Sequence, residues 1–552
     1  MMIVSAIFAL SIAAHATLPT PTPQQYDWHE QERIMFVCLD PCTWQGREYD
    51  DHSTDLADMK LPKLDTEQWC EAAVSWGAKE ILFVAKHTGG FCWWQTDTSD
   101  YSVKNIAWKG GEGDVLVELA KSCRKHALTM GIYVYPGDDT WGAGIGSGGK
   151  TKDPGKQEAY NAVFRQQLRE TLERAREYTT VSEVWFDGSC VIEVGDIIEE
   201  CAPDAVVFQG PHASIRWVGN EKGRLDAAQA WSTLSREDLS TGTSTAVHST
   251  PEGDAWAPLE IDVTLYDHFW FWAEENEQKR KSLDELMRVY YQSAGQGAVM
   301  LLNSTPTTEG LIPEADMTLY RALGAEIDRR FGTPLADTAG VGNTIVLNLG
   351  HTTPVNHVVV MEDYRLGERI RAFEIEGWSK KGGWQVLATG HHVGRKRIVW
   401  FDDAAASKIR FHVSQAAAEP SIRSLAAYHV DGVRIRPEGA LSSPWQQCGA
   451  WARAAFEGRK AAIEIDLTPF ITEPGQYQVQ FKTVDGRRPR CEEEVLLQSG
   501  QASAPGILRR TEGEQNTFDV NRTAVITDQA DIRLKVVLNG KPSEGIVLIR
   551  QR

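Results

Sequence analysis

The sequence between Ile34 and Leu302 alternates short apolar runs with longer stretches of helical periodicity, and this alternation restricts the fold more than any other feature. The apolar runs, which we expect to be strands, are Ile34–Leu39, Glu80–Lys86, Thr129–Tyr135, Glu183–Asp187, Ala205–Gln209 and Val299–Leu302. The helical stretches between them are Thr66–Trp76, Asp114–His126, Tyr160–Glu177, Glu193–Cys201 and Ser282–Ala294. Strands and helices that alternate at this spacing form parallel βαβ units.

The number of units favours a closed barrel. At least six strands over roughly 300 residues fit a (β/α)8-like barrel better than an open, doubly wound sheet. No G-x-G-x-x-G motif follows the first predicted strand, which also disfavours a dinucleotide-binding fold. The stretch Gly210–Asp262 has no clean periodicity, so we expect long loops or a degenerate part of the barrel there.

The helical periodicity stops after about Gly332, and the rest of the chain is rich in strands. Residues 343–436 contain six short strand-like segments separated by turn residues, and a Pro/Gly/Ser-rich link, Arg436–Pro444, precedes a further group. Closely spaced strands of this kind are typical of β-sandwiches. The sequence therefore predicts an α/β chain with a barrel over residues 26–335, followed by two β-sandwich domains over residues 336–437 and 445–552.

The amino-terminal residues predict an export signal. Met1-Met2 is followed by an apolar run from Ile3 to Ala14, and Ala14-His15-Ala16 has the small-x-small pattern of a cleavage site. We therefore expect residues 1–16 to be a signal peptide and the protein to be secreted or periplasmic. No other stretch approaches the length of apolar residues that a membrane span needs.

Composition excludes some functions. The net charge is −19, from 57 Lys and Arg against 76 Asp and Glu, whereas a nucleic-acid binder normally carries a basic surplus. The 19 Trp outnumber both Phe and Tyr, which suits either ring stacking against sugars or bases, or simply large cores. Among nine cysteines, Cys38 and Cys42 are close enough in sequence to form a disulfide, but no C-x-x-C, H-E-x-x-H or zinc-ligand spacing occurs. We therefore predict no cofactor and no catalytic transition metal.

Two predicted strand ends carry chemically interesting residues, and catalytic groups in such barrels lie at the carboxyl ends of the strands. In Glu183-Val184-Trp185-Phe186-Asp187-Gly188, alternation places Glu183, Trp185 and Asp187 on one face, with the Asp187 carboxylate directed into the barrel mouth. The alternative is that Asp187 caps the next helix. The second end, Lys86 to Trp94, runs from Lys-His through two glycines into three aromatic residues, which suggests a polar pocket with a stacking wall. The alternative for His87 is a buried hydrogen-bonding role.

Several further motifs resemble one enzyme family. They are Ser102-Val103-Lys104-Asn105, Trp108-Lys109-Gly110-Gly111, Trp185-Phe186-Asp187-Gly188, Arg216-Trp217-Val218-Gly219-Asn220-Glu221 and Trp231-Ser232-Thr233. Together they resemble the α-L-fucosidases of glycoside hydrolase family 29, in the branch with a narrow linkage preference. The resemblance covers about Ile34 to Phe331 and continues into residues 343–436, which resemble the galactose-binding-like module of that branch. It implies that Asp187 is the nucleophile, that Glu221 is the acid/base, and that His87, Trp185, Tyr133, Arg216, Glu48 and Trp94 contact the sugar.

The chain also departs from the family pattern around the expected sugar. The family sequence F-I-H-F-G is here Phe36 to Asp40, so its histidine is Cys38. The family sequence K-H-H-D-G-F is here Lys86 to Phe91, so its second histidine is Thr88 and its aspartate is Gly89. Its Glu-Trp pair matches Glu48-Tyr49, and Gly137 replaces a tryptophan. We expect Cys38 and Thr88 to contact the substrate and to change the preferred sugar.

These residues predict an exported, retaining exo-glycosidase that hydrolyses a terminal α-L-fucose or a related α-L-sugar of an oligosaccharide or polysaccharide. Three alternatives stay open. Glu237 or Asp238 could replace Glu221 as the acid/base; the preferred sugar could be α-L-galactose, or a sulfated one if Arg47, Lys86 and Arg216 converge; or the protein could bind carbohydrate without catalysis.

Overall fold

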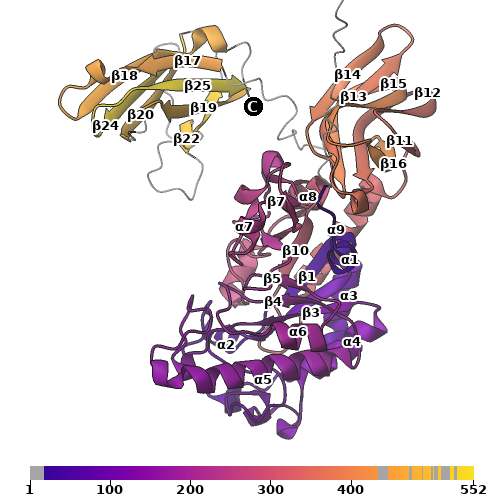
Figure 1. Cartoon of the computed structure of the whole chain (residues 1–552), viewed down its shortest axis with the longest axis vertical. Coiled ribbons are helices and arrows are strands. Elements are labelled where there is room, and N and C mark those ends of the chain that lie inside the picture. The colour runs from indigo at the N-terminus through magenta and orange to yellow at the C-terminus, as the bar shows by residue number, and fades with distance from the viewer. Residues whose placement is uncertain are drawn as a thin grey trace, which may run out of the picture. The chain divides into compact units, whose positions relative to one another are not determined.

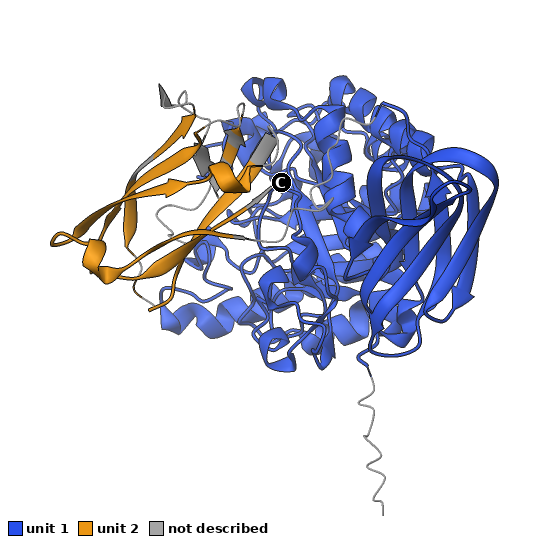
Figure 2. Cartoon of the chain, turned by 90° about the horizontal axis from the view of Figure 1, so that it is seen from above, with its two compact units in different colours: residues 1–433 blue, residues 434–552 orange. Residues whose placement is uncertain are grey.

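A computed structural model describes residues 18–432, 446–471, 475–485, 487, 489–498, 501–502, 508–510, 522–526 and 531–551. The chain divides into two compact units, residues 1–433 and residues 434–552 (Figure 2). The predicted signal peptide, residues 1–16, and the predicted link Arg436–Pro444 lie outside the described residues. Within the described ranges, no helix has the length and apolar character that crossing a membrane requires.

Eight parallel strands form the barrel of the first unit (Figure 1). They follow the order β5-β4-β3-β2-β1-β10-β9-β6. Their bounds are β1 (Arg33–Val37), β2 (Glu80–Lys86), β3 (Thr129–Val134), β4 (Val181–Trp185), β5 (Val206–Phe208), β6 (Arg216–Trp217), β9 (Leu259–Val263) and β10 (Val299–Ser304). A parallel bridge between Phe208 and Ile215 joins the two edges, so the barrel nearly closes. The predicted barrel is confirmed, and the very short β6 lies in the stretch that lacks periodicity.

Most barrel helices begin and end within a few residues of the predicted ranges. They are α3 (Thr66–Ser75), α4 (Val115–Lys125), α5 (Gln157–Arg176), α6 (Gly195–Cys201) and α8 (Leu283–Gln292). Aspartates start two of them: Asp65 accepts hydrogen bonds from two peptide N–H groups in the first turn of α3, and Asp114 accepts one in the first turn of α4. Such caps satisfy the donors that a helix start leaves unpaired. Two further helices, α1 (Pro23–Gln31) and α9 (Glu314–Phe331), were not expected from the sequence.

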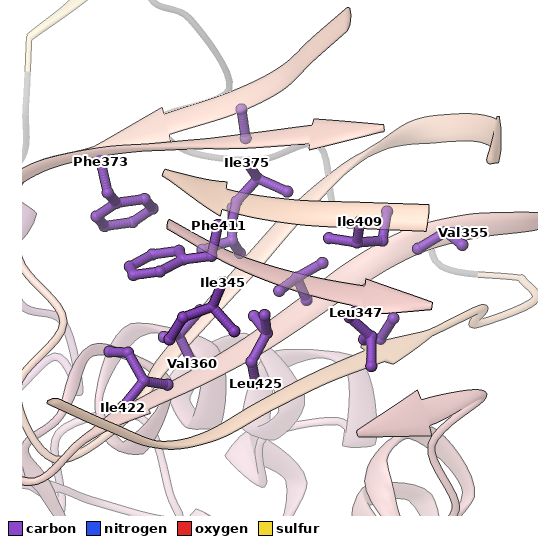
Figure 3. Packing of buried hydrophobic residues seen from close by; sticks show 14 of the residues in the cluster. Ile345, Leu347, Val355, Val360, Phe373, Ile375, Ile409, Phe411, Ile422 and Leu425 are labelled. Atoms are coloured by element: carbon purple, nitrogen blue, oxygen red, sulfur yellow. The ribbon is translucent and has the colours of Figure 1, made fainter. Parts of the chain in front are cut away.

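A continuous antiparallel sheet follows α9 in the same unit. Its strands are β11 (Ala336–Val341), β12 (Thr344–Glu362), β13 (Ile370–Ser379), β14 (Gly383–Gly390), β15 (Arg397–Ala416) and β16 (Ser421–Tyr428), in the order β11-β16-β12-β15-β13-β14. The pairing of β12 with β15 is interrupted by register shifts after Asn348 and after Val355. Figure 3 shows apolar side chains of these strands, among them Phe373 and Phe411, packed against one another as a separate hydrophobic core.

Buried and half-buried ion pairs attach this sheet to the barrel. Arg395 and Lys396, which precede β15, contact the Glu32 carboxylate at 2.8 and 3.1 Å. Arg423 of β16 contacts Glu30 of α1 at 2.8 Å. Lys396, Arg395 and Arg33 hold the pKa of Glu32 well below its usual range, against the effect of burial. Breaking one such pair would leave an uncompensated buried charge, so we regard the barrel and this sheet as one structural body.

The second unit consists of two antiparallel sheets. One has the order β17-β25-β19-β23-β22 and the other β18-β24-β20-β21. The strands are β17 (Gln446–Trp451), β18 (Lys460–Asp466), β19 (Gly475–Thr483), β20 (Arg490–Gln498), β21 (Gln501–Ala502), β22 (Leu508–Arg510), β23 (Arg522–Ile526), β24 (Arg533–Asn539) and β25 (Gly545–Gln551). Side chains of both sheets share one apolar core that includes Phe481 and Leu534. The expected second sandwich is confirmed.

Candidate active site

A pocket of about 150 Å³ opens at the carboxyl ends of the barrel strands, which is where barrels of this kind place their chemistry. Its lining is Phe36, Cys38, Glu48, Tyr49, Val84, His87, Tyr133, Trp185, Asp187, Phe208, Gln209, Trp217, Glu221, Asp262, Trp270 and Phe271. A larger hollow of about 480 Å³ lies near α1 and the amino-terminal starts of β3 and β4, and it contains none of the predicted site residues. The smaller pocket is therefore the candidate active site.

Asp187 lies two residues beyond the end of β4. The hydroxyl of Tyr133, on the neighbouring β3, donates a hydrogen bond of 3.0 Å to its Oδ2. Burial raises the pKa of Asp187, the hydrogen bond from Tyr133 lowers it, and the negative charge of Glu221 raises it again. The next helix, α6, begins after Val194 and has no side-chain cap, so Asp187 does not serve as one.

Glu221 follows β6 in a loop and is solvent-exposed at the pocket. Its charge contributes to the raised pKa values of Asp187, Glu48 and Asp262, so four carboxyl groups share one electrostatic environment. The alternative acids, Glu237 and Asp238, lie on the short helix α7 (Arg236–Leu239) and do not line the pocket.

Stacked aromatic rings form one side of the pocket. The Trp185 ring lies parallel to Phe208 at a centroid distance of 3.9 Å and stacks on Tyr133 at 5.3 Å. The Trp185 indole N–H donates to the buried Glu260 carboxyl at 2.8 Å, which fixes the orientation of the ring. A rigid apolar face beside two carboxyl groups is suited to the carbon-rich side of a sugar ring.

His87, at the end of β2, forms another wall. Its ring is parallel to Tyr49 at a centroid distance of 6.0 Å, and burial lowers the pKa of His87 to about 3, so the imidazole is neutral. Glu48 accepts a hydrogen bond of 2.8 Å from the peptide N–H of Trp270, and Phe271 packs against His87 at 5.0 Å. The β9–α8 connection is thereby held over the pocket.

Three predicted contact residues do not line the pocket. Arg216 is almost fully buried, because its guanidinium donates to the carbonyl oxygens of Trp231, Thr245 and Ala257 and thus braces neighbouring loops. Trp94 is fully buried, with its indole N–H donating to Glu170 at 2.8 Å. Thr88 is absent from the lining, and its hydroxyl is 3.5 Å from the Nδ1 atom of His87.

The basic residues considered for a sulfated substrate also do not converge. The Lys86 ammonium is buried and contacts Asp138 at 3.3 Å and Gln167 at 3.0 Å. Arg47 pairs with Asp51 at the surface. No lysine or arginine occurs in the described lining of the pocket, which gives no support to an anionic sugar in this position.

Sequence reasoning missed several lining residues, of which Asp262 near the end of β9 is chemically the most important. Its Oδ1 accepts the indole N–H of Trp217 at 2.7 Å, and burial, aided by the charge of Glu221, raises its pKa to about 8. A signal for it existed, because Glu260 and Asp262 alternate in Leu259–Val263 as Glu183, Trp185 and Asp187 do around β4. The weak periodicity of the preceding stretch concealed that strand.

The positions that depart from the expected sequence pattern are structurally accommodated. Cys38 lines the pocket with a buried thiol, and both it and Cys42 are free, so the disulfide considered for them is not formed. A side chain at Gly89 would begin 2.2 Å from Oδ2 of Asp50, whose carboxylate fills that space. A side chain at Gly137 would begin 2.6 Å from the ring of Tyr135. Neighbouring residues therefore occupy the space of the missing side chains.

Comparison with known proteins gives a consistent result. The model of the family described as "Alpha-L-fucosidase" matches residues 24–329. Alpha-L-fucosidase 1 of Arabidopsis thaliana is 27% identical over 461 residues, which cover 74% of this chain and 88% of the plant protein. The crystal structure of a candidate α-L-fucosidase from Bacteroides thetaiotaomicron is 31% identical, with a TM-score of 0.69, and covers 75% of this chain and 100% of its own. A glycoside hydrolase 29 family member from an unknown rumen bacterium is 25% identical, with a TM-score of 0.67, and covers 97% of this chain and 96% of its own.

Proposed function

The chain belongs to the α-L-fucosidase family of glycoside hydrolases, and we propose that it releases a terminal α-L-fucose or a closely related α-L-sugar by double displacement. The observation that carries this proposal is the presence of Asp187 and Glu221 in one pocket of about 150 Å³, the scale of one monosaccharide. A retaining glycosidase needs such a pair, one as nucleophile and one as acid and base.

In the first step, Asp187 attacks the anomeric carbon while the bond to the leaving oxygen breaks. Glu221 gives its proton to that oxygen, so the aglycone departs as a neutral alcohol and the sugar becomes an ester of Asp187. In the second step, the Glu221 carboxylate removes a proton from water, and the resulting hydroxide displaces Asp187 from the anomeric carbon. Both residues return to their starting forms, and the product keeps the configuration of the substrate.

The environments of the two carboxyl groups suit these roles. Asp187 must be ionised to attack, and the Tyr133 hydroxyl, 3.0 Å from its Oδ2, favours the ionised form. Glu221 lies on a solvent-exposed loop, where water can reach it for the second step. The neutral imidazole of His87 and the ring of Trp185 add shape and hydrogen-bonding capacity without adding charge.

We further propose that the preferred sugar differs from plain fucose. Cys38 replaces a histidine of the family pattern within the pocket lining, and Gly89 and Gly137 have lost side chains whose space is filled by neighbours. Each directed hydrogen bond lost from a sugar hydroxyl is worth about 0.5–1.5 kcal/mol. The pocket lining has Cys38 in place of a histidine, and its described part contains no lysine or arginine. We therefore propose α-L-galactose, or a fucose with an uncharged substituent, as the preferred sugar.

The test is sugar release from a panel of α-L-fucosides, α-L-galactosides and sulfated oligosaccharides, with Asp187→Asn as the matched inactive control. We expect release of a neutral α-L-sugar by the wild type and a loss of several orders of magnitude in kcat in the variant, because no glycosyl ester can form. Binding of these sugars without any release would instead support a non-catalytic carbohydrate-binding protein. Preferential release of a sulfated sugar would contradict this proposal, because the described lining of the pocket contains no lysine or arginine to pair with a sulfate group.

Export is part of the proposal. It is supported by the apolar run Ile3–Ala14 and the Ala14-His15-Ala16 pattern. Expression of the full chain should yield a periplasmic or secreted protein whose mass lacks residues 1–16. A protein that stays in the cytoplasm with residues 1–16 intact would contradict it.

A further inference from the structure

A second group of reactive side chains lies beside the sugar pocket. It comprises Asp40, in the loop after β1, Cys42, the first residue of the short helix α2 (Cys42–Gln45), and His87, which follows β2. One potential ligand atom from each lies within 4.8 Å of the other two, and all three residues are buried. The Cys42 thiol is free. Only His87 is shared with the sugar pocket, so the double-displacement chemistry does not account for Asp40 or Cys42.

Asp40 has no adequate partner for a buried carboxyl group. It is fully buried, and neither carboxylate oxygen has a hydrogen bond of normal geometry. The thiol and peptide N–H of Cys42 lower the pKa of Asp40 slightly against the effect of burial, and the His87 Nδ1 atom is 3.8 Å from Oδ2. In the part of the chain that the structure describes, no lysine or arginine pairs with Asp40, while Asp50 adds a second negative charge nearby. Burial and the charge of Asp50 raise the pKa of Asp40, so this carboxyl group is kept from ionising unless a cation is bound beside it.

We propose that Asp40, Cys42 and His87 form a binding site for a divalent transition metal ion, with Zn²⁺ as the best match. Carboxylate, thiolate and imidazole are the ligands that Zn²⁺ takes in proteins. Zn–N and Zn–O bonds of about 2.0–2.2 Å in a tetrahedron imply about 3.3–3.5 Å between those two ligand atoms, so the 3.8 Å between Nδ1 and Oδ2 has to shorten by only a few tenths of an ångström when the ion binds. Binding releases the thiol proton of Cys42, and the carboxyl proton of Asp40 where that group is protonated, to water, and it places the positive charge beside Asp40 and Asp50.

The site escaped sequence analysis because its spacing matches no zinc motif. Asp40 and Cys42 are two residues apart, but His87 comes from the next strand of the barrel. The carboxyl ends of β1 and β2 are adjacent because these strands pair in parallel, and this adjacency brings the three ligands together. Three protein ligands leave the fourth tetrahedral position for water or another group.

The site has a consequence for the pocket. A metal ion on Nδ1 obliges the imidazole proton of His87 to stay on Nε2, which fixes the tautomer and makes that atom a hydrogen-bond donor. His87 would then be a sugar-binding residue whose tautomer and orientation are set by a metal behind it. This consequence rests on the proposed function, whereas metal binding itself does not.

The experiment uses the full chain, freed of metal by a chelator and titrated with Co²⁺, which reports thiolate coordination by a near-ultraviolet charge-transfer band. We expect one Co²⁺ per chain with that band, and its displacement by one equivalent of Zn²⁺. Cys42→Ala should abolish the band, whereas Cys190→Ala, which removes an equally free and buried thiol outside the group, should keep it. Asp40→Asn, which preserves side-chain shape, should weaken Zn²⁺ binding about tenfold or more.

Three results would overturn the proposal. They are the absence of stoichiometric Co²⁺ and Zn²⁺ uptake by the wild type, uptake without the thiolate band, and an unchanged band in folded Cys42→Ala. If Cys42→Ala does not fold, the wild-type spectrum and the Zn²⁺ affinity of Asp40→Asn decide. Because none of these measurements involves a sugar, failure here would leave the proposed glycosidase activity standing, and failure of that activity would leave the metal site standing.

Discussion

Replacing Tyr133 with phenylalanine removes the one side-chain hydrogen bond that the proposed nucleophile, Asp187, accepts among the residues that the structure describes. The Tyr133 hydroxyl donates to Asp187 at 3.0 Å, and its ring is 2% exposed and stacked on Trp185. Tyr133→Phe keeps the ring and its packing and removes only the hydroxyl. The change should therefore act on the protonation and orientation of Asp187 rather than on the fold.

The magnitude follows from the chemistry of a carboxylate that loses a donor. A hydrogen bond to a charged group contributes about 1.5–3 kcal/mol, and one pKa unit corresponds to about 1.36 kcal/mol. The bond favours the ionised carboxylate, so its removal should raise the pKa of Asp187 by about one to two units. Catalysis requires ionised Asp187, so the acidic limb of the pH profile should move to higher pH by the same amount.

The assay is kcat/KM as a function of pH on the best substrate of the sugar panel, because this parameter reports ionisations of the free enzyme. Tyr135→Phe is the matched control. Tyr135 follows the same strand and stacks near Tyr133, but its hydroxyl accepts the peptide N–H of Gly146 and makes no hydrogen bond to Asp187. An acidic limb that stays in place in Tyr133→Phe, or that moves equally in Tyr135→Phe, would refute the reasoning.

Three other substitutions test separate parts of the account. Glu221→Ala should slow cleavage of natural glycosides by about 10²–10⁴-fold but spare the first step on a glycosyl fluoride, whose leaving group needs little protonation. Azide should then restore turnover by giving the glycosyl azide with retained configuration. Equal slowing of both substrates without azide rescue would show that Glu221 is not the acid/base and that Glu237 and Asp238 should be tested next. An aryl α-L-fucoside should be a poor wild-type substrate, with kcat/KM below about 10⁴ M⁻¹s⁻¹. Cys38→His should improve it by roughly 2- to 10-fold, and an efficient wild type would show that the lost imidazole is neutral. The pKa of Asp262 is about 8 in the folded protein and about 3.8 in the unfolded chain, so the folded state holds one more proton between these values. The wild type therefore loses stability as pH rises from about 4 to 8, and Asp262→Asn should flatten this pH dependence. Between about pH 6 and pH 8 this group alone should cost about 2 kcal/mol, and identical thermal melts of variant and wild type at both pH values would contradict the assignment.

The sequence predicted the barrel because its strands are buried on both faces. β2 is buried along its whole length, and such strands appear as uninterrupted apolar runs that periodicity detects. β6 has only two residues and gave no signal. Helix α9, which spans Glu314–Phe331, was missed although its buried residues Met317, Tyr320, Leu323 and Ile327 recur at helical spacing. Two charged residues of the same helix, Asp316 and Arg330, are buried through ion pairs, which the apolar pattern does not show.

The site was predicted in outline because strand ends determine which residues meet, but not how deep each side chain lies. Asp187 and His87 lie within two residues of strand ends, and the structure brings both into the pocket. Arg216 also lies on a strand, yet its long side chain turns inward to satisfy backbone carbonyl oxygens that belong to loops distant in sequence. Trp94 lies beyond the two-glycine turn, and its indole N–H donates a hydrogen bond to Glu170 of helix α5, which holds the ring against that helix. Such tertiary hydrogen bonds leave no local pattern in the sequence.

The most direct test of the central claim is to trap the sugar on the nucleophile. A fluorinated α-L-fucosyl or α-L-galactosyl fluoride, whose ring fluorine slows hydrolysis of the glycosyl ester, should accumulate as a covalent adduct of the full chain. Peptide mapping by mass spectrometry should find one sugar per chain, on the peptide that contains Asp187 and on its carboxylate. An adduct on a different carboxylate, or an inverted product from a natural substrate without any adduct, would contradict the account.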